Sequence, residues 1–181
     1  MKFKENNLFR SDPESFRNNA CVGKNGGPYN LGAYAFGYYR ACEAIVESEN
    51  LKYYIDTMIY PLCFNFRQFL ELSLKDFLEE IGKKGSSKHN LKNDWNILKQ
   101  YLVEHQTFPT EEVDYIGNII ECFVEIDKKS LVFRYPSCKQ NKKHLQEWSL
   151  ISVKVLADNL EKTRDIFELW FYGIETSKSI Q

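Results

Sequence analysis

The chain has 181 residues, of which 43% are hydrophobic, 15% aromatic and 27% charged. This size and composition fit one domain with a substantial apolar core, and they exclude a disordered or low-complexity protein. The 24 basic and 25 acidic side chains give a formal charge of −1. Binding to nucleic acid would therefore depend on local basic patches rather than on overall charge.

The first 28 residues are interpreted as a polar, flexible lead-in that ends in the glycine-rich stretch 23–28. This stretch lacks the G-x-x-x-x-G-K-[ST] spacing of a phosphate-binding loop and follows no apolar strand, which favours a linker. The sequence has no apolar run of signal-peptide or membrane-spanning length. We therefore expect a cytoplasmic protein that does not enter a membrane.

Apolar residues at helical spacing predict helices over residues 31–49, 51–81, about 95–104, 110–127 and from 153 onward. Pro61 lies within the second of these helices and predicts a kink or break near that position. Asn93 or Asp94 is expected to cap the third helix.

No convincing alternating strand and no internal repeat is found in the sequence. The pattern therefore predicts an all-α bundle of about five helices in a single domain over residues 29–173. Residues 131–133 are expected to be briefly extended, and residues 174–181 to form a tail.

The five cysteines are widely spaced without a C-x-x-C pair, and the three histidines are too scattered to form a ligand pair. This pattern predicts reduced thiols, no metal site and no cofactor.

Arg67 falls on the apolar face of the second helix, in register with Cys63, Leu70 and Leu74. Glu71 and Lys75 follow at i+4 and i+8, so three charges of alternating sign form a ladder. Burying an arginine is costly unless it is paired, and Glu71 supplies that partner. Two interpretations stay open: a structural ion pair inside the bundle, or a guanidinium held by Glu71 and directed at a phosphate.

Two basic segments accompany this ladder in the sequence. One is the loop around His89, with Lys83, Lys84, Lys88 and Lys92, and the other runs from residue 128 to 144, with six basic residues and no acid. They are either ordinary solvated loops or the rim of a phosphate site. The helix from 111 to 127 carries acids and no base, so its face is expected to repel nucleic acid.

Four short stretches carry a family resemblance: Tyr60-Pro61, Phe66-Arg67-Gln68-x-x-Glu71-Leu72-x-x-Lys75, His89-Asn90-Leu91 ahead of Trp95, and Phe133-Arg134-Tyr135-Pro136. Together they resemble bacterial HEPN-like helical proteins over about residues 58–137. The resemblance implies a helical bundle that is frequently dimeric. It also implies either a metal-independent ribonuclease of a toxin–antitoxin or phage-defence system, or a nucleotide-binding protein without catalysis.

One departure from the family pattern bears on catalysis. The ribonuclease members carry an arginine, four to six residues and then a histidine, whereas the corresponding positions after Arg67 are Leu72, Ser73 and Leu74. None of these can act as a general acid or base at neutral pH. Cleavage would then require His89. Folding back of the chain after the second helix is expected to bring His89 near Arg67 and Arg134 at a single polar cleft.

Two functions follow. The first is a HEPN-like RNA- or nucleotide-directed protein, potentially an endoribonuclease, with Arg67, Glu71 and His89 as catalytic residues and Arg134, Lys75 and Lys88 as phosphate-binding residues. The alternative is a non-catalytic helical module that binds a nucleotide or a protein, in which the same residues lock the bundle. The expected partners are a second copy of the chain, through residues 61–81 or the first helix, and an antitoxin-like protein. An open cleft favours the first function, and occluded, mutually paired side chains favour the second.

Overall fold

The computed structural model describes residues 6–23, 26–105 and 108–178. Residue contacts divide the chain into two compact units, Met1–Asn30 and Leu31–Gln181. In the described part of the first unit, the short 3-10 helix η1 (Phe16–Asn18) lies between Asp12 and Asn19, which exchange two hydrogen bonds of 2.8 Å. The buried hydrophobic core of the described residues belongs entirely to the second unit.

The second unit is all-helical, which confirms the predicted fold class. Its helices are α1 (Leu31–Val46), α2 (Leu51–Glu80), α3 (Leu91–His105), α4 (Thr110–Asp127) and α5 (Val153–Lys178). The described residues form no β-strand, and one isolated bridge pairs Ser137 with Lys143. None of the described helices is long and apolar enough to cross a membrane.

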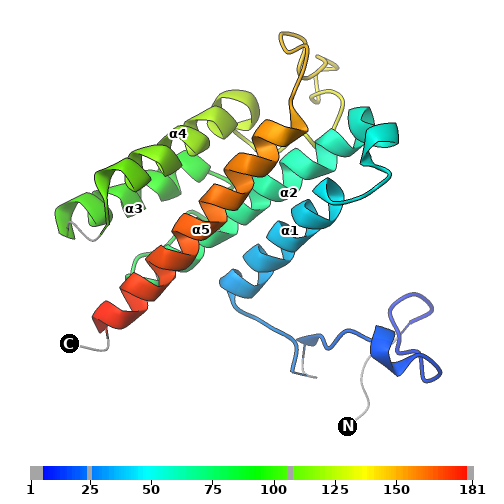
Figure 1. Cartoon of the computed structure of the whole chain (residues 1–181), viewed down its shortest axis with the longest axis horizontal. Coiled ribbons are helices and arrows are strands. Elements are labelled where there is room, and N and C mark those ends of the chain that lie inside the picture. The colour runs from blue at the N-terminus through cyan, green and yellow to red at the C-terminus, as the bar shows by residue number, and fades with distance from the viewer. Residues whose placement is uncertain (1–5, 24–25, 106–107, 179–181) are drawn as a thin grey trace. The chain divides into compact units, whose positions relative to one another are not determined.

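α2 is the central helix of this bundle. It packs against α1, α3 and α5, while α4 packs against α3 and α5. In Figure 1, α1, α2 and α5 run alongside one another, and α3 and α4 form a neighbouring pair. Because α2 has helices around it, Arg67, Gln68 and Glu71 are buried together with its apolar residues.

An aromatic cluster around Trp170 joins three of these helices. The Trp170 ring stacks on Trp95 of α3, with centroids 6.4 Å apart, and lies edge-on to Phe77 of α2. Its indole Nε1 donates to Glu112 of α4 over 2.8 Å. A buried indole needs such an acceptor, so this bond fixes the start of α4 against α5.

Pro61 lies inside α2, which continues through it. The departure from helical backbone angles is upstream, at Tyr54, where φ is −125° and ψ is 17°. The Thr57 hydroxyl donates to the Tyr54 carbonyl over 2.9 Å. Tyr54 lies seven residues, about two turns, before Pro61, so the predicted kink is found near the start of the helix and not at the proline.

Three local predictions need correction. α3 begins at Leu91 rather than near Trp95, because Asn90 Oδ1 accepts the N–H of Asn93 over 3.2 Å and takes the capping role assigned to Asn93 or Asp94. Residues 131–133 belong to a turn, not an extended segment, since the N–H of Arg134 donates to the Leu131 carbonyl. α5 extends to Lys178, so residues 174–178, assigned to a tail, are helical.

The C-terminal end of α5 provides a test of where the folded unit ends. Ile174 is 4% exposed, whereas Leu169 on the same helix is 61% exposed. We predict that Ile174→Ala lowers the free energy of unfolding by about 2–4 kcal/mol, because it leaves a cavity in the core. Leu169→Ala should change it by less than about 0.5 kcal/mol. Urea unfolding followed by circular dichroism measures both, and equal effects would mean that residue 174 lies outside the cooperative unit.

Candidate functional site

Arg67 lies in the middle of α2 with no solvent exposure, yet each of its three side-chain nitrogens donates a hydrogen bond. Nη1 donates to Glu71 Oε2 over 2.8 Å, and Nε donates to the backbone oxygen of Asp127 over 3.1 Å. Nη2 donates to the backbone oxygen of His89 over 3.3 Å. A guanidinium removed from water requires both bonded N–H groups and a balancing charge, and this arrangement supplies both.

Glu71 provides the balancing charge, and its side chain is only 2% exposed. Its Oε1 accepts a hydrogen bond from Lys75 Nζ and lies 2.8 Å from His89 Nδ1. Burial raises the pKa of the Glu71 carboxyl, but the hydrogen bonds from Lys75 and Arg67 outweigh burial and leave that pKa below its ordinary value of 4.5. Glu71 is therefore ionised at neutral pH.

His89 is the open member of this cluster, with a side chain that is 59% exposed. Because ionised Glu71 can only accept hydrogen bonds, we assign the proton of the facing nitrogen to His89 Nδ1. In the neutral ring, Nε2 then keeps its lone pair. A carboxylate that holds one imidazole nitrogen fixes the tautomer and the ring orientation, which is what a proton-transfer histidine needs.

The loop at residues 82–90 brings His89 back along α2. Gly85 approaches Lys75 so closely that an added Cβ would lie 2.9 Å from Lys75 Cγ. Further along, the N–H of Ser86 donates over 2.7 Å to Asp94, which is fully buried on α3. The predicted proximity of His89 to the Arg67–Glu71 pair is confirmed, because the loop itself reverses direction.

The Arg67 guanidinium also holds the end of α4. Asp127 accepts from Arg67 with its backbone oxygen, and its Oδ1 accepts two N–H groups of the following turn over 2.7 and 3.1 Å. Ser130 in that turn has a left-handed backbone, with φ of 57°, and its hydroxyl accepts from Gln68 over 3.0 Å. Arg67 and the adjacent Gln68 therefore fix the start of the second basic segment.

Arg134 lies in that second segment and is exposed. Its Nε donates to the Ser130 backbone oxygen over 2.6 Å, and its guanidinium lies 5.6 Å from the Phe64 ring centroid and 5.5 Å from that of Tyr135. Among the described residues it has no hydrogen bond or ion pair with Glu71 or His89. The structure therefore brings Arg67, Glu71 and His89 together, while Arg134 belongs to a neighbouring aromatic cluster.

The two predicted phosphate-binding lysines occupy different environments. Lys75 is partly buried and its ammonium group is paired with Glu71. Lys88 is exposed in the loop that carries Lys83 and Lys84. Lys75 thus stabilises the buried cluster, whereas Lys88 lies where it can contact a ligand.

The cluster has a closed part and an open part. Arg67 and Glu71 are occluded and satisfy one another, which favours the structural interpretation of this pair. His89, Lys88 and Arg134 are exposed. Within the described ranges, no group of three or more His, Cys, Asp or Glu side chains is placed to hold a metal ion.

Several contributors to this site were not identified from the sequence. Asp127 acts on Arg67 through a main-chain oxygen, and any residue type would offer that acceptor. Gln68 and Ser130 form a side-chain pair between segments that are distant in the sequence. Phe64 contributes through its ring, 5.6 Å from the Arg134 guanidinium, and this contact between distant segments has no signal in the sequence spacing.

The chain was compared with family models, curated proteins and solved structures, and none of them gave a match. The resemblance to HEPN-like proteins stays a prediction.

The different burial of Glu71 and Lys75 leads to a stability prediction. Glu71→Ala leaves the Arg67 charge buried and unpaired, so we expect the free energy of unfolding to fall by about 3–5 kcal/mol. Lys75→Ala removes a partly exposed partner and should cost less than about 1 kcal/mol. Urea unfolding of both variants measures the difference. Equal losses would contradict the structural role of the Arg67–Glu71 pair.

Proposed function

We propose that this protein is a HEPN-like helical module that binds RNA on a basic surface formed by residues 82–90 and 128–144. The observation that carries this proposal is the pair of hydrogen bonds that Arg67 donates to the main-chain oxygens of His89 and Asp127. One buried guanidinium thereby holds two basic segments at the same level of α2. Arg67 and Glu71 act in this proposal as the structural support of the surface.

The charges of the two segments suit a phosphate backbone. The first contains Lys83, Lys84, Lys88 and His89 without an acid, and the second contains six basic residues without an acid. Contacts to phosphates supply most sequence-independent affinity for nucleic acid. We expect the exposed acids of α4 to repel the phosphate backbone and so to direct RNA away from that helix.

The cluster around Arg134 adds a way to contact bases. Tyr135 is 52% exposed beside the Arg134 guanidinium, which Ser130 holds in place. Aromatic rings and guanidinium planes stack on unpaired bases, and base edges are accessible only where RNA is single-stranded. The proposed ligand is therefore RNA with unpaired bases.

The proposal includes the predicted homodimer and selects one of its two predicted interfaces, residues 61–81 or the first helix. Most residues of α2 between Leu62 and Leu78 are buried within the bundle, whereas Tyr34 and Phe36 of α1 are exposed. Exposed aromatic side chains are typical anchors of protein interfaces. We therefore assign self-association, or the docking of an antitoxin-like protein, to α1.

RNA binding can be tested with a fluorescently labelled single-stranded RNA and anisotropy measured over a series of salt concentrations. We expect Lys88→Ala to reduce the slope of log affinity against log salt by about one. Arg134→Ala should reduce the slope similarly and also lower affinity at high salt, because a stacking partner is lost. Lys162→Ala on α5 is the matched control. Equal effects of all three substitutions would contradict the proposed surface.

A second candidate function is RNA cleavage by His89, favoured by its 2.8 Å contact with Glu71. His89 Nε2 would remove the proton of a ribose 2′-hydroxyl, whose oxygen attacks the adjacent phosphorus. The bond from phosphorus to the 5′-oxygen breaks, which yields a 2′,3′-cyclic phosphate and a 5′-hydroxyl. The departing 5′-oxygen takes a proton from the His89 imidazolium or from water.

The cleavage candidate is tested by incubating the purified protein with single-stranded RNA and resolving the products on a denaturing gel. If His89 is the base, His89→Ala abolishes cleavage while thermal stability is retained, since the ring is largely exposed. His105→Ala, which changes an exposed histidine at the end of α3, should leave cleavage unchanged. Intact RNA after incubation with the wild-type protein would eliminate cleavage and leave the binding proposal standing.

A further inference from the structure

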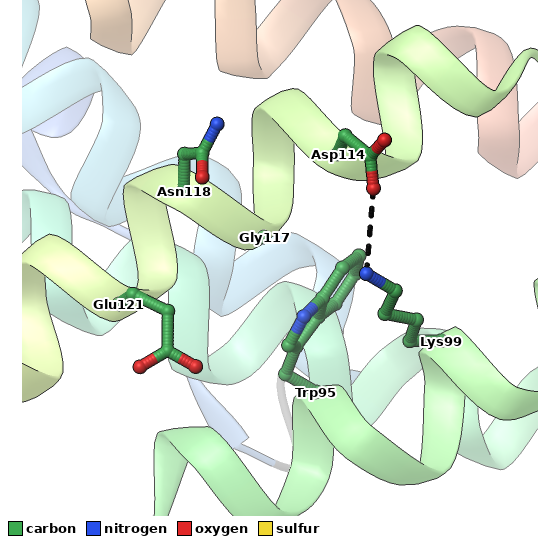
Figure 2. A pocket seen from close by; sticks show the side chains of 6 residues that line it. All are labelled: Trp95, Lys99, Asp114, Gly117, Asn118 and Glu121. Atoms are coloured by element: carbon green, nitrogen blue, oxygen red, sulfur yellow. Dashed lines mark hydrogen bonds and ion pairs between the residues drawn. The ribbon is translucent and has the colours of Figure 1, made fainter.

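A second site lies between α3 and α4, on residues that the RNA proposal does not use. It is a groove with a volume of about 340 Å³ (Figure 2). The side chains that line it come from both helices: Trp95, Lys99, Asp114, Gly117, Asn118 and Glu121. Figure 2 shows the indole of Trp95 between the two helices, with Lys99 and Asp114 on one side and Glu121 on the other.

The indole of Trp95 presents an unused hydrogen-bond donor to this groove. The residue is 2% exposed, and its Nε1 donates to no described residue, whereas the Nε1 of Trp170 donates to Glu112. Among the described residues, Trp95 Nε1 is not one of the buried side-chain atoms that lack a partner, so this N–H is open to the groove, where an acceptor can approach it. A Cβ at Gly117 would lie 3.4 Å from Trp95 Nε1, so the glycine leaves space beside the donor. A carbonyl oxygen of a ligand in the groove would accept a hydrogen bond from the N–H of Trp95.

The two acidic side chains of α4 that line the groove are paired with lysines of α3. Asp114 pairs with Lys99 over 3.4 Å, and Glu121 pairs with Lys92 over 3.0 Å. All four side chains are well exposed, and ion pairs of this kind exchange readily because they are worth little. α4 carries no basic residue of its own. A ligand with guanidinium groups can replace the lysines, because its paired N–H groups match a carboxylate.

We propose that this groove binds an arginine-bearing peptide segment of a partner protein. The peptide's guanidinium groups bond to Asp114 and Glu121, and one of its carbonyl oxygens accepts from Trp95 Nε1. The two acids are seven positions apart on α4, which corresponds to about 10 Å along a helix. In a polyproline II peptide, residues three positions apart lie on one side at about 9 Å. An Arg-x-x-Arg sequence in that conformation matches the groove.

The test uses the full chain labelled with ¹⁵N and the side-chain N–H signals of its three tryptophans. The probe is the peptide Ac-Gly-Arg-Pro-Pro-Arg-Gly-NH2, and the control peptide carries glutamate in place of both arginines. We expect saturable shifts of the Trp95 indole and of the Gly117 and Asn118 amides, with the indole of Trp148 unchanged. The arginine peptide should bind at least about tenfold more tightly than the control peptide.

Protein variants locate the contacts. Asp114→Asn and Glu121→Gln each remove one charge with little change of shape and should weaken binding by about threefold to tenfold. Glu161→Gln removes one charge from α5 and should have no effect. Trp95→Phe keeps an aromatic ring in the core but deletes the donor, so affinity read from the Gly117 amide should fall by about threefold or more.

Three results would overturn the proposal: no saturable shift of the Trp95 indole, equal binding of the two peptides, or an effect of Glu161→Gln as large as that of Glu121→Gln. Guanosine monophosphate is tested in parallel, because a guanine base also offers N–H donors and a carbonyl oxygen. Shifts caused by the nucleotide but not by the peptide would likewise overturn it. RNA binding uses residues outside this groove, so its success or failure is read separately.

Discussion

The buried guanidinium of Arg67 is the constraint on which the site depends. A cation removed from water must find acceptors within the protein, and these come from three segments: Glu71 on α2, the His89 carbonyl and the Asp127 carbonyl. The loop before α3 and the turn after α4 therefore converge on one side chain. An unpaired N–H inside the bundle would cost about 1–3 kcal/mol, so each hydrogen bond to the guanidinium helps to hold its segment in place.

Glu71 links the buried charge of Arg67 to the exposed ring of His89. One oxygen serves Arg67, and the other serves Lys75 and His89, so one carboxylate both balances the buried charge and orients an exposed ring. Changes at Glu71 therefore affect stability and any chemistry of His89 together. A substitution of His89 separates the effect on stability from the effect on chemistry, because Arg67 bonds to the main-chain oxygen of His89 and not to its ring.

The features predicted from the sequence are those set by local geometry. The Arg67–Glu71 pair is confirmed because residues four apart on a helix lie side by side, and the five helices follow from the apolar spacing. The start of α3 was misplaced because Asn90, Asn93 and Asp94 are all good caps, and the buried Asp94 accepts from Ser86 instead. The contact between Arg67 and Asp127 could not be predicted, since a main-chain acceptor has no residue-type signature.

Asp127 also explains how two surfaces of opposite sign coexist on one short stretch of chain. The acids of α4 end at this residue, and the basic segment begins at Lys128. Asp127 is 1% exposed, and its carboxylate is turned inward to accept the N–H groups of the next turn. The last acid of α4 is thereby removed from the surface where RNA is proposed to bind. Lys92, next to the loop at residues 82–90, pairs with Glu121 over 3.0 Å, so the change of sign from the basic loop to the acidic face of α4 takes place across one exposed ion pair.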